Sequence, residues 1–183
     1  MQFPIHYRDF ILRPEILDDV DELKRFSDQL VDERAMIGRR DKRSKAEWEA
    51  SVGMAVKAMK TRQAVVIVAE KEKKIVGLSA IFLQAQKMDP IGVLGIMVDR
   101  DVRCQGLGRK LMEVIIAWAQ DMLLGLECIE LGAIADNPPA VALYKQMGFV
   151  SVARIPSRLN HFGVYYDEEI MQLWVRPPKS ISS

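Results

Sequence analysis

The chain has 183 residues, 49% of them hydrophobic and 28% charged, which suffices for one buried core and gives no reason to expect two domains. A formal net charge of +1 provides no general attraction to polyanions, so we do not expect the chain to bind nucleic acid. Two cysteines and two histidines are too few for a disulfide framework or a typical structural zinc site, and we expect no metal.

The first residues, MQFPIHYRDF, lack the basic region and apolar core of a secretory leader. No apolar run approaches the roughly 20 residues that cross a bilayer. We therefore expect a cytoplasmic protein that does not associate with membranes.

Two helices follow a short first strand at residues 10–13. In residues 15–30, apolar side chains recur at helical spacing and form one stripe made of Ile16, Val20, Leu23, Phe26 and Leu30. Residues 44–59 begin with Ser44 and Glu47 at the spacing of a capping box and form the second helix. Between the helices, residues 38–43 (GRRDKR) are either a solvated loop or a lip over a substrate cleft.

Strands dominate the middle of the chain and alternate with helices afterwards. Residues 64–83 predict a hairpin of two strands that turns at residues 71–74, and another strand follows at residues 91–98. The order then becomes helix, strand, helix, strand and strand, at residues 106–124, 128–135, 138–147, 149–155 and 164–175. This order predicts an α/β fold, a mixed sheet with helices on both faces. We expect one domain over residues 1–175 and a short polar tail over residues 176–183.

A glycine-containing loop, VDRDVRCQGLGRK, joins the strand at residues 91–98 to the long helix that follows it. A helix N-terminus presents unpaired backbone N–H groups and the positive end of the helix dipole, which together favour a phosphate. Gly106 and Gly108 let the backbone bend sharply and approach phosphate oxygens, and Arg103, Arg109 and Lys110 add positive charge nearby. The loop therefore suits a pyrophosphate.

Other interpretations of this loop fit less well. A Walker loop requires G-x-x-x-x-G-K-S/T, but Arg109 precedes Lys110 here and Leu111 follows it. A dinucleotide-binding loop requires G-x-G-x-x-G, and Leu111 occupies the third glycine position. A purely structural turn is the remaining alternative, because glycines are common where a strand meets a helix.

Two motifs together resemble the GNAT superfamily of acyl-CoA-dependent N-acyltransferases. Arg103 to Gly108 matches the pattern Q/R-x-x-G-x-G/A, and Asn137 to Phe149 (NPPAVALYKQMGF) is similar to the second pattern, N-x-x-A-x-x-L-Y-x-x-x-G-F. The resemblance implies a mostly antiparallel sheet whose fourth and fifth strands splay apart to admit the pantetheine arm of acetyl-CoA. The splayed strands would be residues 91–98 and 128–135.

The resemblance also implies a set of residues that bind acetyl-CoA. The backbone of one splayed strand would pair with the pantetheine as a further strand does, and the loop would hold the pyrophosphate. Asn137 and Tyr144 on the following helix would complete the site, although Asn137 is equally explained as a helix cap. The implied binding residues are Ile96, Met97, Val98, Arg103, Cys104, Gln105, Gly106, Leu107, Gly108, Arg109, Lys110, Asn137 and Tyr144.

Tyr144 is the residue that the resemblance assigns as the catalytic acid. When an amine attacks a thioester, CoA leaves as a thiolate, so an acid beside the sulfur assists the reaction. The alternative is that Tyr144 packs in the core, as aromatic side chains on helices often do.

The base that deprotonates the amine is harder to assign. Many members of the family use a glutamate on one of the splayed strands, but residues 91–98 contain no acid. Gly132 stands where some peptide-modifying members carry their glutamate. We therefore name Glu130 as the predicted catalytic base, acting through water, with Asp136 and His161 as further candidates.

The resemblance implies an enzyme that transfers an acetyl group from acetyl-CoA to a primary amine by direct attack in a ternary complex. A protein or peptide N-terminus or a lysine is the first expectation for the acceptor, and a small amine stays open. The alternative is a non-catalytic module of the same fold that binds CoA or another protein, which the absence of an acid from residues 91–98 favours. A homodimer is also left open.

Overall fold

The computed structural model describes residues 1–38, 40–84 and 90–176. Its helices are α1 (Val20–Asp32), α2 (Lys45–Lys60), α3 (Leu107–Met122) and α4 (Pro138–Gln146), with short 3₁₀ turns at Leu17–Asp19 and Arg100–Val102. Its strands are β1 (Ile5–Tyr7), β2 (Phe10–Pro14), β3 (Ala64–Lys71), β4 (Lys74–Leu83), β5 (Ile91–Val98), β6 (Cys128–Ile134), β7 (Val150–His161) and β8 (Val164–Trp174). Of the predicted tail, only Arg176 lies within the described residues.

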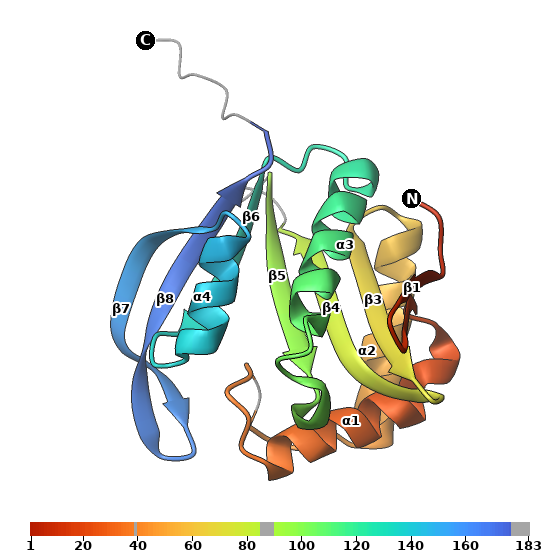
Figure 1. Cartoon of the computed structure of the whole chain (residues 1–183), viewed down its shortest axis with the longest axis horizontal. Helices are drawn as coiled ribbons and strands as arrows, with labels where there is room; N and C mark the ends of the chain where they lie inside the picture. The colour runs from red at the N-terminus through yellow and green to blue at the C-terminus, as the bar shows by residue number, and fades with distance from the viewer. Residues whose placement is uncertain (39, 85–89, 177–183) are drawn as a thin grey trace.

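One sheet of eight strands runs through the described part of the chain in the order β1-β2-β3-β4-β5-β6-β8-β7. Neighbouring strands are antiparallel except β5 and β6, which are parallel. Helices α3 and α4 lie on the face toward the viewer in Figure 1, and α2 lies behind the sheet. The predicted α/β fold, with a mostly antiparallel sheet and helices on both faces, is confirmed.

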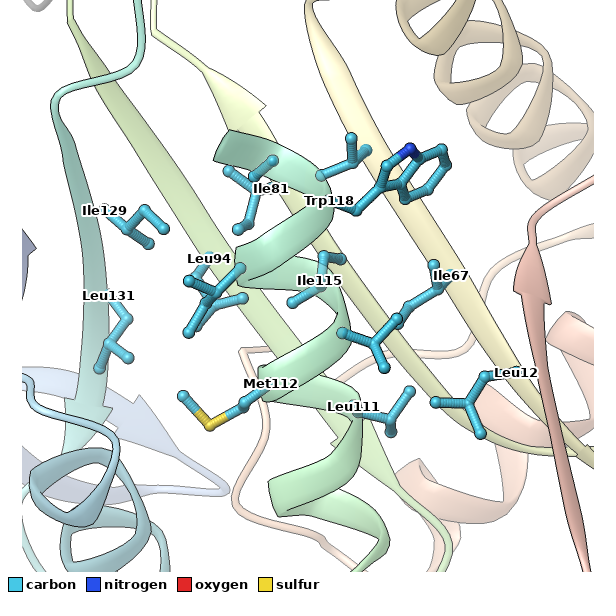
Figure 2. Close-up of a cluster of buried hydrophobic side chains, with 14 of the residues drawn as sticks. Leu12, Ile67, Ile81, Leu94, Leu111, Met112, Ile115, Trp118, Ile129 and Leu131 are labelled. Carbon is cyan, nitrogen blue, oxygen red and sulfur yellow. The ribbon is translucent and has the colours of Figure 1, made fainter. Parts of the chain in front are cut away.

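Helix α3 forms the centre of the main core. Leu111, Met112 and Ile115 are fully buried against the strands, as the helical spacing of apolar residues predicts. Figure 2 shows Met112 extending from α3 toward β6, where Ile129 and Leu131 lie. Helix α3 packs chiefly on β3, β4 and β5, and the core that it centres extends to Ile129 and Leu131 of β6.

A second apolar cluster fixes α1 and α2 to the opposite face of the sheet. Phe26 and Leu30 of α1 and Trp48 of α2 are buried there, against Val68 of β3. The predicted capping box at the start of α2 is formed: the Glu47 amide donates to Ser44 Oγ, and the Glu47 carboxylate accepts from the Ser44 amide.

The structure adds one strand to those predicted and extends another. Strand β1 was not predicted, because three residues of mixed polarity carry no periodic signal. The strand predicted to end at residue 155 continues to His161, although Pro156 lacks the N–H group that a central strand needs. Strand β7 tolerates this proline because it is an edge strand and because its pairing with β8 is irregular between Ile155 and Leu159.

Within the described residues, no helix combines the length and the apolar character needed to cross a bilayer.

Candidate active site

Strands β5 and β6 separate soon after they begin. They pair at three positions, Ile91 with Cys128, Gly92 with Ile129 and Val93 with Glu130. Beyond Val93, β5 continues to pair with β4 as far as Val98, whereas β6 pairs with β8 as far as Ile134. Each strand therefore presents an edge with no strand partner across the gap, within the described residues.

A cavity of about 470 Å³ occupies this gap. On one side its lining includes Gly95 and Ile96 of β5, and on the other it includes Leu131 to Ile134 of β6. Helix α4 contributes Asn137, Ala140 and Tyr144 from the face that also carries α3. We call this cavity the cleft.

The opposite face of the sheet closes the other side of the cleft. Its lining comes from the segment after α1, with Met36, Ile37, Gly38 and Arg40, and from the β7–β8 hairpin, with Leu159, Asn160, His161 and Glu168. The two segments are joined by hydrogen bonds from Arg40 Nη1 to Asn160 Oδ1 (3.4 Å) and between His161 Nε2 and the Arg34 carbonyl (3.1 Å). Gly38 and Arg40 thus border the cleft, as the lip interpretation of residues 38–43 expects, while Arg39 lies outside the described residues.

The glycine-containing loop ends at the N-terminus of α3. Gly106 is the N-cap residue and has a φ of +84°, a left-handed conformation that favours glycine. The first helical hydrogen bond runs from the Lys110 amide to the Gly106 carbonyl, at 3.0 Å, so the amides of residues 107–109 precede the helical ladder. No side chain caps this helix start, which leaves the geometry of an anion site.

The predicted cationic residues of the loop are not equivalent. The Arg103 guanidinium bonds to the Val98 carbonyl, at 3.0 Å, and to the Glu33 carboxylate, so it holds β5 to the end of α1. Arg109 bonds to the Gln146 side chain, which joins α3 to α4. Lys110 lies 3.5 Å from a Glu113 carboxylate oxygen.

The uncharged loop residues also differ in what they can present to a ligand. Cys104 is exposed and has a φ of +61°, and the Gln105 side chain donates to the Asp101 carbonyl at 3.1 Å. The Leu107 side chain is buried in the main core, whereas Gly108 packs against Leu143 of α4. In residues 103–110, the backbone at Gly106 and Gly108 is therefore available to a ligand. The side chains of the segment chiefly hold the loop in place.

The turn between β1 and β2 supplies two loop neighbours that the sequence did not indicate. Arg8 Nη1 donates to the Gln105 carbonyl at 2.7 Å. A Cβ atom placed on Gly106 would lie 2.7 Å from the Tyr7 hydroxyl, so this hydroxyl covers the N-cap directly. The Arg8 guanidinium and the Lys110 ammonium lie 5.4 and 5.9 Å from the centre of the Tyr7 ring. Neither motif includes Tyr7 or Arg8. They lie far from the loop in the sequence, and only the fold brings them next to it.

Helix α4 carries the predicted acid into the cleft. Asn137 caps the helix by accepting from the Ala140 amide at 3.4 Å, and Pro138 occupies the first turn, where its missing N–H group costs nothing. Tyr144 lines the cleft, and its ring lies 6.3 Å from that of Phe149. Burial raises the pKa of Tyr144, so the phenol is protonated at neutral pH.

The three predicted bases lie in different surroundings. Glu130 is absent from the described lining of the cleft, and its Oε2 accepts from Gln172 Nε2 at 2.8 Å. Asp136 is exposed in the turn before α4. His161 borders the cleft at the β7–β8 end. Sequence reasoning did not consider Glu168, which also lines the cleft and whose carboxylate lies against Gly132.

Comparison with known proteins places these features in a family. A curated protein, camello of Xenopus laevis, is named as a probable N-acetyltransferase and is 32% identical over 56% of this chain and 49% of its own. The chain thus spans about half the length of that relative. Two solved structures share the fold, with TM-scores of 0.81 in both cases. One is a GNAT-family acetyltransferase of Streptococcus pneumoniae, 24% identical, with 91% of this chain and 99% of that chain covered. The other is yncA of Salmonella typhimurium, solved with its cofactor acetyl-CoA, 19% identical, with 94% and 98% covered.

A family model gives the more direct assignment. The model described as the acetyltransferase (GNAT) family matches residues 25–149, a range that contains both motifs, the splayed strands and most of the cleft lining. The chain therefore belongs to the GNAT acetyltransferase family.

Proposed function

We propose that the protein transfers the acetyl group of acetyl-CoA to a primary amine by direct attack in a ternary complex. The observation that carries this proposal is the open edge of β5. It faces the cleft, with the glycine-containing loop beyond its C-terminal end and Tyr144 across the gap.

Acetyl-CoA would be a substrate here, and the residues present fit it. The backbone of Ile96, Met97 and Val98 would bond the pantetheine amides in the way that an added strand is bonded. The amides at the start of α3 would hold the pyrophosphate, with Lys110, Arg109 and Arg8 supplying charge around them.

Tyr144 would act where the thioester meets the cleft. Attack by the amine expels a thiolate, and a phenol kept protonated by burial can donate its proton to the sulfur. Asn137 would support this arrangement by fixing the first turn of α4, from which Tyr144 projects.

The acceptor is proposed to be a protein or peptide amine, with a small amine as the second choice. The face of the cleft away from α3 and α4 is bordered by Arg40, Asn160 and His161, and an entering chain end would replace the hydrogen bond between Arg40 and Asn160. The cytoplasmic location remains a prediction from the sequence.

Titration and turnover test this function in one series. Acetyl-CoA should bind the wild-type chain in calorimetry, and CoA thiol should be released when an amine panel of peptides, amino acids and polyamines is added. Tyr144→Phe should lower kcat by about tenfold to a hundredfold with little change in acetyl-CoA affinity, because only the proton donor is lost.

The control for this variant is Tyr165→Phe, which removes the hydroxyl of an exposed tyrosine on β8. Tight acetyl-CoA binding without turnover across the whole panel would support the non-catalytic module instead. Absence of acetyl-CoA binding would reject both the enzyme and the CoA-binding module.

A further inference from the structure

We infer that Glu168 is the general base that deprotonates the acceptor amine, and that Arg158 positions it. The inference rests on the proposed function and names a catalytic residue outside the two splayed strands. Among the described lining of the cleft, the ionisable side chains are Arg40, Tyr144, His161 and Glu168, so Glu168 supplies the sole carboxylate.

The register of β6 and β8 explains how Glu168 reaches the cleft. Glu168 pairs with Ile134, two residues along from Gly132, and alternate residues of a strand share one face. Glu168 and Gly132 are therefore diagonal neighbours on the face of the sheet opposite to α3. The Glu168 side chain leans along this diagonal toward the gap between the splayed strands.

Gly132 makes room for this carboxylate. A Cβ atom placed on Gly132 would overlap Glu168 Oε1 and would lie 3.2 Å from its carboxyl carbon. The backbone of Gly132 needs no glycine for its conformation, since its φ is not in the left-handed region. The absent side chain instead leaves a space on β6, and a carboxylate from β8 fills it.

The irregular part of β7 holds Glu168 in place. Residues 156–158 lie between the regular pairs Ile155–Glu168 and Leu159–Tyr166, and Arg158 Nε lies 2.7 Å from Glu168 Oε2. The Arg158 side chain is 59% exposed, whereas that of Glu168 is 17% exposed. The guanidinium thus engages one carboxylate oxygen from the solvent side, and the other oxygen lies over Gly132.

Glu168 and Tyr144 approach the gap from opposite faces of the sheet. Tyr144 belongs to α4, on the face that carries α3, and Glu168 lies on the face that carries the segment after α1. An amine entering on the Glu168 side would meet a thioester held at the gap, with the proton donor for the sulfur beyond it. The proton acceptor and the proton donor thus reach the gap from opposite sides.

The step balances with these two groups and solvent. Glu168 takes one proton from the ammonium group, and the freed lone pair forms the N–C bond to the thioester carbonyl. The C–S bond then breaks, and the sulfur takes the Tyr144 proton. The second proton of the attacking nitrogen returns to Tyr144 through solvent, and Glu168 releases its proton to solvent. The net products are an amide, CoA thiol and one proton.

The central experiment compares Glu168→Gln with Glu169→Gln in the full chain. Glu169 is the adjacent residue on β8, on the opposite face, and its carboxylate bonds to the Ser151 hydroxyl. We expect Glu168→Gln to lower kcat by about a hundredfold or more and to leave the acetyl-CoA Kd within about threefold, as loss of a general base predicts. Glu169→Gln should keep wild-type kcat.

A pH profile separates a catalytic role from a structural one. In Glu168→Gln the amine must lose its proton to solvent, so kcat should rise by about tenfold per pH unit, whereas wild-type kcat should stay flat over the same range. The other ionisable groups that border Glu168 (Arg40, Arg158, His161 and, across the gap, Tyr144) are present in both proteins. Arg158→Gln should lower kcat less than Glu168→Gln and should keep the flat profile.

Each outcome has a distinct meaning. A Glu168→Gln variant that keeps kcat within about threefold of the wild type would overturn the inference and leave the proposed function standing. Parallel pH profiles for the two proteins would also overturn it, because they indicate a structural defect. Acetyl-CoA binding by the wild type without turnover would overturn the inference together with the proposed acetyl transfer.

Discussion

The candidate active site has two ends, the glycine-containing loop and the side of the cleft away from α3 and α4, and they are assembled in different ways. The loop end is made chiefly from one continuous segment, residues 103–110. Its backbone amides near Gly106 and Gly108 are the groups proposed to hold the pyrophosphate. The opposite end gathers side chains from the segment after α1 and from the β7–β8 hairpin, around the backbone of Gly132 in β6. The first end depends on local backbone geometry, whereas the second depends on strand register.

This difference determines how each end should fail. A single substitution that alters the backbone should disable the loop end, since no second segment can replace the amides at the helix start. At the other end, the Glu168 carboxylate can be displaced, removed or moved to the neighbouring strand β6. Binding of acetyl-CoA and transfer to the amine should therefore be separable by mutation.

The largest effect is expected at the loop end, from Gly106→Val. The side chain would force an unfavourable left-handed conformation, would collide with the Tyr7 hydroxyl and would cover the amides of the helix start. We expect the acetyl-CoA Kd in calorimetry to rise by about a hundredfold, which corresponds to about 3 kcal/mol of binding free energy.

Gly125→Val is the matched control for this change. Gly125 has a φ of +82°, close to that of Gly106, and open space around its Cβ position. It should lower stability by a similar backbone cost and keep the affinity for acetyl-CoA. Equal loss of affinity in both variants would show that the loop end depends on overall stability and not on its local geometry.

The next effect is expected at the opposite end, from Gly132→Ala. The added methyl group would displace the Glu168 carboxylate, which can move because it lies at the end of a flexible side chain. We expect kcat to fall by about tenfold, with acetyl-CoA affinity retained. Stopped thiol release assays and calorimetry on the same sample measure the two quantities.

The same end can be tested by moving the carboxylate. Glu168→Ala combined with Gly132→Glu should recover at least about tenfold of the activity lost in Glu168→Ala alone, because the acid would then project from β6 into the same space. If the double variant is no more active than Glu168→Ala, then catalysis requires a carboxylate that extends from β8, and a carboxylate that reaches the same space from β6 does not replace it.

A smaller effect is expected from Arg8→Gln in the turn between β1 and β2. It removes the charged hydrogen bond to the Gln105 carbonyl, worth about 1 kcal/mol, and should raise the acetyl-CoA Kd by about fivefold. Arg8→Lys keeps the charge and loses the fixed guanidinium geometry. An affinity for Arg8→Lys equal to the wild type would assign the effect to charge alone.

The smallest effect on activity is expected from Glu15→Gln, which lies at neither end. Glu15 is buried, its Oε2 has no hydrogen-bond partner among the described residues, and burial followed by the Asp19 charge raises its pKa from 4.5 to about 8. Because the folded state holds this proton more tightly, Glu15 contributes stability at low pH that is lost as the pH rises from about 4.5 to about 8.

Chemical denaturation at pH values across this range measures the contribution. In the wild type, Glu15 should lower the unfolding free energy by about 1 kcal/mol per pH unit, and Glu15→Gln should remove that part of the slope. The kcat of this variant should equal that of the wild type. A changed kcat would mean that the substitution at Glu15, directly after β2, alters the cleft.

The contrast between the ends also explains what could be predicted from the sequence. Residues 91–98 were identified with their observed bounds because a short apolar run flanked by turn residues is a strong strand signal. The loop and α4 could be located because each is formed by residues close together in the chain, and their roles in binding and catalysis stay predictions. Tyr7 and Arg8 could not be, since only the packing of the β1–β2 hairpin brings them to Gly106.

Glu168 was missed for a related reason. Its role depends on which strand lies beside β6 and on the register between them, and neither is encoded within a short segment. The sequence predicted Glu130 as the base, with Asp136 and His161 as further candidates, and Gly132 appeared as a missing residue. In the structure that glycine is a space into which the neighbouring strand extends a side chain.

The three residue pairs between β5 and β6 have a consequence for how the molecule opens. Amides on the free edges of these strands have no strand partner in the described residues, so their hydrogens should exchange with solvent faster than those of the β3–β4 ladder. Acetyl-CoA bound between the edges would act as a non-covalent cross-link between the two parts of the sheet. Its binding should slow exchange on both sides of the seam together, so that the sheet opens as one cooperative unit.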